Sequence, residues 1–196
     1  MIEPKEQHLT QECMAFLREV GFEVQEQSGA GGVVPGVKIQ EGALLVDPET
    51  ALVSDVLHEA GHLATVPGRF RKWFTGNVQG GQKRIMEVLE HENVDPDSPM
   101  FRAIIQCSDT EATAWAWAAG RHLGFPEEKI IRDKDYGEDG ESIRLMLSLN
   151  SYVGIHGLAN AGFCCTRPIL SDVTGLPAYP ELKMWVQPED LSRTPV

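Results

Sequence analysis

The sequence predicts a single α+β domain that is mainly helical and contains one small hairpin sheet. Several segments repeat apolar residues at helical spacing, and two short apolar segments flank a turn-forming dipeptide. The chain has 196 residues, a length that suits one domain with a modest core. No internal repeat divides it. We therefore expect residues 1–196 to form one domain.

The N-terminal part is expected to form a helix, a strand and a hairpin. An amphipathic stripe predicts the helix, and its members are Leu9, Cys13, Phe16, Leu17 and Val20. Residues 22–24 are typical of a short strand. Residues 37–40 and 43–46 then predict a hairpin that turns at Glu41-Gly42.

A second helix is bounded by clear start and stop signals. Asp47 can cap it, Pro48 suits its first helical position, and Glu49 suits the positive end of the helix dipole. Pro67 and Gly68 end it. Its apolar residues form a broad surface made by Leu52, Val53, Val56, Leu57, Ala60, Leu63 and Ala64. We therefore expect this helix to be buried on most sides.

Within this helix, residues 58–62 read His-Glu-Ala-Gly-His. Positions i and i+4 lie one turn apart on the same helix face, so His58 and His62 can bind one metal ion. Glu59 would lie near that ion, where the pattern His-Glu-x-x-His uses its glutamate as a general base. Buried histidines need partners, and a metal ion is one such partner. The alternative is a pair of core histidines bonded to backbone carbonyl groups.

A catalytic zinc site usually has three protein ligands, so the chain must supply another. The metzincin extension needs a glycine and a histidine where this chain has Thr65 and Gly68, which excludes that arrangement. We predict Glu111 as the third ligand, because alanines on its side of the helix at 108–120 permit close helix approach. Asp109 is the weaker candidate, because it is better suited to cap that helix.

These segments resemble the gluzincin branch of the zinc metallopeptidases. The resemblance rests on the His-Glu-Ala-Gly-His helix and on the run Glu-Ala-Thr-Ala-Trp-Ala at residues 111–116. Because a hairpin at 37–46 precedes the motif helix, the chain is also loosely similar to the ImmA/IrrE-type peptidase domain. The resemblance covers about residues 37–126. It implies a zincin-like fold and hydrolysis of peptide bonds in a peptide or protein substrate.

In this interpretation the two histidines and Glu111 hold Zn²⁺, which activates water and polarises the substrate carbonyl. Glu59 takes a proton from the water and passes it to the leaving amine. Tyr152 and His156 are candidates for a second donor to the tetrahedral oxyanion, since they share one face if their segment is helical. The alternative is that Tyr152 packs at the core edge and His156 bonds to backbone.

The remaining segments complete the predicted domain. Residues 67–107 form an insertion between the two ligand helices, and this insertion contains a predicted helix at 82–92. A further helix is predicted at 141–149. The proline-bearing segment 167–196 is expected to be a C-terminal arm that wraps the same domain.

Composition argues against several other functions. The net charge of −12 would repel a phosphate backbone, so we expect no nucleic-acid partner. No segment approaches the length of a membrane span, so we expect no membrane partner. The N-terminal residues lack the basic and apolar pattern of a secretory signal. The four cysteines lack the spacing of a thiolate zinc site or a disulfide framework, which indicates reduced thiols and a cytoplasmic location.

Two functions from different classes remain open. The first is a zinc-dependent peptidase, and the second is a non-catalytic metal-binding module that regulates or binds a partner. Glu59 favours the enzyme, because a structural zinc site has four protein ligands and needs no general base.

Overall fold

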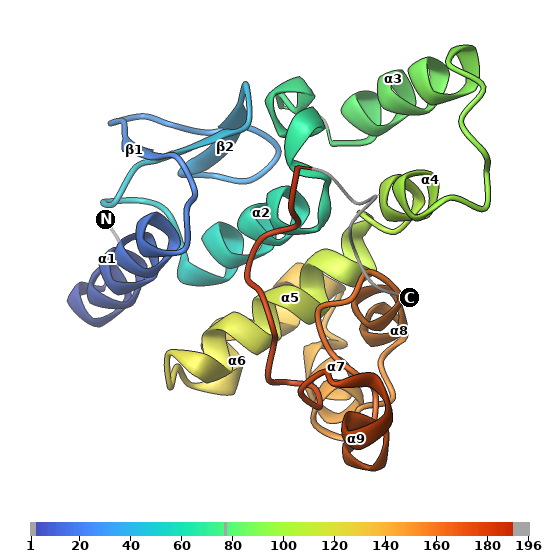
Figure 1. Cartoon of the computed structure of the whole chain (residues 1–196). Helices are drawn as coiled ribbons and strands as arrows, with labels where there is room; N and C mark the ends of the chain where they lie inside the picture. Colours follow the sequence, from blue (N-terminus) through green and yellow to red (C-terminus); the bar gives the residue numbers. More distant parts are fainter. Residues whose placement is uncertain (1–2, 77, 190–196) are drawn as a thin grey trace.

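The computed structural model describes residues 3–76 and 78–189, which form an α+β arrangement with a small sheet beside a set of helices (Figure 1). The strands are β1 (Val24–Glu26), β2 (Val37–Gln40) and β3 (Ala43–Val46). The α-helices are α1 (Pro4–Glu19), α2 (Val53–Thr65), α3 (Val78–His91), α4 (Pro99–Ile105), α5 (Asp109–His122), α6 (Glu127–Ile130), α7 (Gly140–Ser148), α8 (Val153–Asn160) and α9 (Ser171–Thr174). Short 3-10 helices are η1 (Gly68–Trp73), η2 (Asp133–Tyr136) and η3 (Pro168–Leu170). The α+β class agrees with the sequence-based prediction.

The sheet has the strand order β1-β3-β2, with β3 in the centre. The predicted hairpin is confirmed, because β2 and β3 pair antiparallel and turn at Glu41 and Gly42, both with positive φ. At Gly42 any Cβ would lie 2.7 Å from the carbonyl oxygen of Arg71, so this position requires glycine. The strand predicted at 22–24 is β1, which begins two residues later and pairs parallel with β3.

The start of the motif helix differs from the prediction. Asp47 does not cap α2, which begins at Val53 after an uncapped Leu52. The Asp47 carboxylate instead accepts hydrogen bonds from the backbone N–H groups of Gly29 and Glu49. Asp47 therefore fixes a turn that precedes the helix, and the start of α2 obtains its partner from elsewhere in the chain.

That partner is Glu6 on α1, a side chain that is only 4% exposed. Its Oε1 atom accepts a hydrogen bond from the backbone N–H of Val53 at 3.3 Å. Its Oε2 atom forms an ion pair with Lys129 Nζ at 2.6 Å. A negative charge at a helix N-terminus is favourable, so Glu6 ties α1 and α6 to the first turn of α2.

We predict that Glu6→Ala lowers the free energy of unfolding by about 2 kcal/mol, because the Val53 N–H loses its hydrogen-bond acceptor and the Lys129 ammonium loses its ion-pair partner. Urea unfolding followed by circular dichroism measures this loss. The matched control is Glu12→Ala, an exposed position on the same helix, which should change stability by less than about 0.5 kcal/mol. Equal losses in both variants would mean that Glu6 stabilises only through helix propensity.

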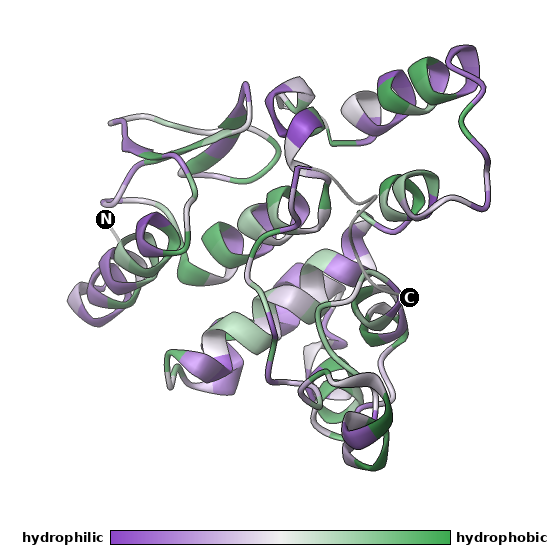
Figure 2. Cartoon of the chain, in the orientation of Figure 1, coloured by the Kyte–Doolittle hydropathy of each residue, from purple (hydrophilic) through white to green (hydrophobic). Residues whose placement is uncertain are grey.

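The core centres on the packing of α2 against α5, which run side by side in Figure 1. Apolar residues dominate the buried length of α2, as the green colour in Figure 2 shows. A Cβ added at Gly61 would lie 2.5 Å from the Ala112 carbonyl oxygen and 2.8 Å from its Cα. Glycine at position 61 and alanine at 112 therefore allow the two helix backbones to touch.

On its other side α5 packs against α8, again through glycine. A Cβ at Gly154 would overlap the Thr110 carbonyl group. The weak helix propensity of this glycine-bearing segment is thus overridden by tertiary packing, and residues 153–160 are helical.

Residues 176–189 lie across α5 and α2, and they form the red segment that crosses these helices in Figure 1. The Tyr179 hydroxyl donates to the Ala114 carbonyl at 2.9 Å, and Trp115 Nε1 donates to the Trp185 carbonyl at 3.0 Å. The Gln187 N–H donates to the Ala64 carbonyl at 2.8 Å. The last part of the predicted arm, 190–196, lies outside the described residues.

Two other predicted helices are present. The helix predicted at 82–92 is α3, which begins four residues earlier, and the helix predicted at 141–149 is α7. The segment 67–107 lies between α2 and α5 and contains η1, α3 and α4. No helix in the described ranges is both long enough and apolar enough to cross a membrane.

Candidate metal centre

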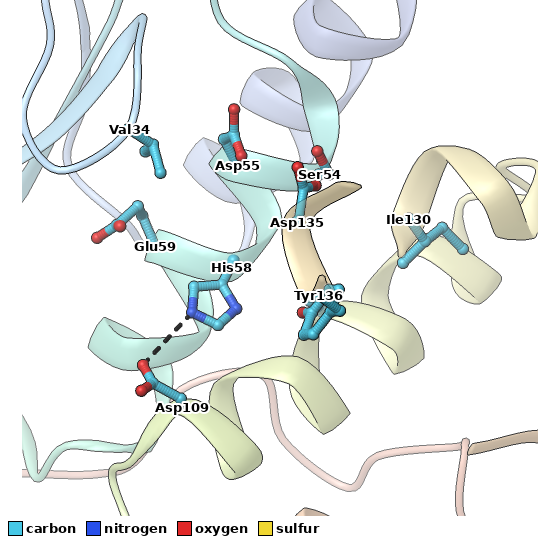
Figure 3. Close-up of a pocket in the computed structure, with 10 residues that line it drawn as sticks. Val34, Ser54, Asp55, His58, Glu59, Asp109, Ile130, Asp135 and Tyr136 are labelled. Carbon is cyan, nitrogen blue, oxygen red and sulfur yellow. Dashed lines mark ion pairs between the residues drawn. The ribbon is translucent and has the colours of Figure 1, made fainter. Parts of the chain in front are cut away.

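Two imidazole nitrogens and one carboxylate oxygen meet where α2 faces the start of α5. Asp109 Oδ1 lies 3.2 Å from His62 Nε2 and 3.7 Å from His58 Nε2. The two imidazole rings stand nearly perpendicular, with centroids 4.8 Å apart. Figure 3 shows His58 and Asp109 pointing toward each other across the gap between the helices. This group could hold a metal ion.

The spacing of these atoms fits a small tetrahedral ion. Ligand bonds of about 2.0–2.1 Å at a tetrahedral angle place neighbouring ligand atoms about 3.3 Å apart. The two distances from Asp109 Oδ1 fall on either side of that value, at 3.2 and 3.7 Å. His62 is buried, whereas the Asp109 side chain is 75% exposed. The group is therefore anchored in the core on one side and open on the other, as a site with a free coordination position requires.

The helix contact at Gly61 explains why Asp109 reaches the histidines. Ala112 is the residue of α5 that touches Gly61, and Asp109 precedes it by three positions. Residues three apart lie on the same face of a helix, so Asp109 also faces α2. His58 and His62 flank Gly61 on the opposite helix. The close approach of the two backbones thus brings all three side chains together.

Glu111, the predicted third ligand, is not part of this group. Its carboxylate accepts hydrogen bonds from the hydroxyls of Ser108 and Thr110. It also lies against α8, where a Cβ at Gly157 would overlap it. Two positions along a helix correspond to about 200° of rotation, so Glu111 and Asp109 cannot face the same neighbour. The structure places Asp109, the candidate thought to be a cap, beside the histidines.

Glu59 lines the pocket next to His58. Burial raises the pKa of its carboxyl group, while the nearby histidines oppose the rise. A raised pKa makes a carboxylate a better proton acceptor near neutral pH. In Figure 3 the carboxylate points away from the His58 ring, so a rotation of the side chain would be needed to bring it toward the group.

Thr113 and Tyr136 complete the surroundings of His58, and sequence analysis missed both. Thr113 Oγ1 lies 3.5 Å from His58 Nδ1 and 3.0 Å from the Tyr136 hydroxyl. Burial raises the pKa of Tyr136 to about 12, so its hydroxyl stays protonated at neutral pH. Thr113 could have been found, because it lies one turn after Asp109 on the same face. Tyr136 comes from η2, and no local pattern marks it.

Tyr152 and His156, the two predicted hydrogen-bond donors to the oxyanion, lie in different environments. Tyr152 is buried at the start of α8, where burial raises the pKa of its hydroxyl and the Thr113 side chain opposes the rise. It is not among the described residues that line the pocket beside the histidines, but its hydroxyl interacts with the Thr113 side chain. His156 is exposed on α8 and does not line this pocket either. The geometry gives neither residue direct access to the group.

The pocket has a volume of about 330 Å³ and opens beside His58 (Figure 3). Among the described residues, its lining is formed by Val34, Ser54, Asp55, His58, Glu59, Asp109, Ala116, Ile130, Asp135 and Tyr136. They come from α2, α5, α6, η2 and the loop before β2. The lining combines two of the three candidate metal ligands and the candidate base with apolar walls, a composition typical of ligand-binding pockets.

Asp55 is half-buried in this pocket, and its charge should lower the free energy of unfolding at neutral pH. Burial raises its pKa from 3.8 to about 6, with a further rise from Asp135. The folded protein therefore disfavours the charged form, and the penalty grows as the pH rises through this window. We predict that Asp55→Asn raises the free energy of unfolding of the metal-free protein by about 1 kcal/mol at pH 7.5.

The gain should shrink as the pH falls through this window and disappear below about pH 3, where Asp55 is protonated in both the folded and the unfolded state. Thermal unfolding at several pH values measures it. The control is Asp172→Asn, an exposed position on α9 that should show no such pH-dependent gain. A loss of stability in Asp55→Asn at every pH would show instead that the carboxylate makes a favourable contact.

Comparison with known proteins gives no further guide to this site. No protein-family model matches the chain, no curated protein matches it, and no solved structure matches it. Its chemistry must therefore be inferred from the residues themselves.

Proposed function

We propose that the chain is a zinc-dependent peptidase in which His58, His62 and Asp109 hold the ion and Glu59 is the general base. The observation that carries the proposal is the convergence of two imidazole nitrogens and a carboxylate oxygen at the spacing of zinc ligands. Two members of the group, His58 and Asp109, line a pocket that also contains the Glu59 carboxylate with its raised pKa. The resemblance of the motif helix to zinc metallopeptidases is consistent with this chemistry. An aspartate as third ligand would differ from the glutamate that the gluzincin resemblance implies.

The donor set suits zinc, which commonly takes histidine nitrogens together with a carboxylate oxygen. When bound, the ion would supply Lewis acidity that activates water and polarises a substrate carbonyl. Thr113 would orient the His58 ring through Nδ1 and so direct Nε2 toward Asp109. His62 Nδ1 is buried and has no hydrogen-bond partner within the described parts of the chain.

Glu59 would take the proton released when water attacks the carbonyl carbon, and would then deliver it to the departing amine nitrogen. Its raised pKa makes Glu59 a better proton acceptor than an ordinary carboxylate. Tyr136 lines the same pocket and carries a hydroxyl proton at neutral pH, so it can donate a hydrogen bond to the oxyanion. Thr113 holds that hydroxyl at 3.0 Å and thereby fixes its position.

The test is hydrolysis of a fluorogenic peptide library by zinc-loaded protein. We predict turnover that a chelator abolishes, and a loss of at least 100-fold in kcat for Glu59→Gln with zinc content unchanged. The matched control is Glu90→Gln, an exposed glutamate of α3, which should retain the wild-type rate. Stoichiometric zinc without cleavage of any peptide would favour the non-catalytic metal-binding module. Failure to bind zinc after reconstitution would contradict both functions.

A further inference from the structure

One end of the pocket carries negative charge that the proposed peptidase mechanism does not use. Asp55 on α2 and Asp135 on η2 line this end together with Ser54, and the three side chains lie above His58 in Figure 3. The two carboxylates are close enough for Asp135 to raise the pKa of Asp55. Asp109, by contrast, lies on the opposite side of His58.

The charges that surround Asp55 leave this end negative. Arg132 lies 3.7 Å from Asp135 Oδ1 and is the cation that acts most strongly on Asp55, while His58 acts in the same direction. Glu59 adds a further negative charge. Within the described parts of the chain, the lining contains no lysine or arginine. One arginine therefore acts on two carboxylates, and this end of the pocket keeps an excess negative charge.

Ser54 provides a second, independent observation. It is only 5% exposed, and its hydroxyl has no hydrogen-bond partner in the parts of the chain that the structure describes. Ser54 lines the pocket together with Asp55 and Asp135, so its buried hydroxyl lies next to the acidic end. A buried hydroxyl without a partner costs free energy, so a ligand that supplies one is favoured there.

The rest of the pocket is apolar. Val34, Ala116 and Ile130 contribute apolar walls to it. Such walls suit a hydrocarbon stem, whereas the carboxylates and the hydroxyl suit a charged donor at its tip. A metal ion is a poorer match for this end, because Asp55 and Asp135 belong to no group of three metal-ligating side chains among the described residues.

We infer that Ser54, Asp55 and Asp135 form a subsite that binds an organic cation of the substrate, either the side chain of lysine or arginine or a peptide amino terminus. The inference rests on the proposed peptidase function and names the substrate feature that the site selects. An ammonium or guanidinium group has several N–H donors, enough for both carboxylates and the hydroxyl. The energetic cost of keeping the Asp55 charge in the fold is consistent with a binding role rather than a stabilising one.

The experiment measures peptide binding without requiring turnover. Calorimetry on zinc-loaded Glu59→Gln protein compares terminally blocked alanine peptides that carry one lysine, moved through each position, with norleucine counterparts of the same length. Norleucine keeps the hydrocarbon stem and removes the charge. We expect a lysine at one position to bind about tenfold more tightly than norleucine. If an unblocked norleucine peptide bound about as tightly as the blocked lysine peptide, the cation in the subsite would be the peptide amino terminus.

Charge-removing variants then locate the preference. Added to Glu59→Gln, Asp55→Asn and Asp135→Asn should each reduce the lysine-to-norleucine affinity ratio to about twofold or less. Asp172→Asn removes one charge far along the chain, on exposed α9, and should keep the full ratio. The proposed subsite would be contradicted by a lysine-to-norleucine affinity ratio near one in the Glu59→Gln protein. It would also be contradicted if Asp55→Asn and Asp135→Asn left that ratio unchanged.

Parallel hydrolysis by zinc-loaded wild type separates the two proposals. Cleavage of lysine and norleucine peptides at equal rates would support the peptidase function and contradict the cation-binding subsite. A charge-dependent binding preference without cleavage of any peptide would contradict the peptidase function and support a cation-selective peptide-binding site.

Discussion

Replacing Asp109 by alanine should lower the affinity for zinc at least 100-fold, whereas Glu111→Gln should still bind one zinc ion per chain. The reason is geometric, because Asp109 Oδ1 lies 3.2 Å from His62 Nε2, while the Glu111 carboxylate is bonded to Ser108 and Thr110. Loss of one of three protein ligands removes a direct bond to the ion, and even loss of an outer partner costs 10- to 100-fold. Competition with a chromophoric chelator measures both affinities.

His62→Ala is the positive control, since both ligand sets include it, and it should lose zinc as strongly as Asp109→Ala. Circular dichroism of each metal-free variant shows whether the fold is kept. Retention of zinc by Asp109→Ala together with its loss from Glu111→Gln would restore the ligand set predicted from sequence. That result would require α5 to rotate by about half a turn when the ion binds.

The contrast between Asp109 and Glu111 shows where inference from the sequence stops. Local patterns place the motif helix, the hairpin and the helix at 109–122, because periodicity and turn residues depend on short-range chemistry. They do not fix the rotation of one helix against another. Here that rotation depends on Ala112 touching Gly61 and on Thr110 touching Gly154, contacts between residues far apart in the chain.

The same limit explains the other differences. The aspartate predicted to cap the motif helix lies in a preceding turn, because Glu6 of α1 occupies the position of a capping acceptor. Tyr136 and Asp135 reach the pocket from a single 3-10 turn, whose sequence gives no signal of proximity to α2. Residues that complete a site through tertiary contacts are found only once the packing is known.

The contact at Gly61 leads to the second large prediction. Gly61→Ala should lower the free energy of unfolding by about 2–3 kcal/mol, because the new Cβ would lie 2.5 Å from the Ala112 carbonyl oxygen. The higher helix propensity of alanine offsets only about 1 kcal/mol of that cost. The three atoms nearest to the new Cβ all belong to the Ala112 backbone, so no side-chain rotation can relieve the overlap, and α5 must move away from α2.

That movement should also weaken zinc binding, because Asp109 lies one turn from Ala112 and moves with it. Urea unfolding and chelator competition on the same variant measure the two effects. Gly31→Ala is the matched control, since its Cβ would meet only the Gly36 nitrogen at 3.8 Å, and it should change neither quantity. A Gly61→Ala variant that is destabilised but binds zinc as tightly as wild type would show that the ligands do not depend on the helix contact. Loss of both would establish that the smallest residue of the motif sets the distance between the histidines and the carboxylate of the facing helix.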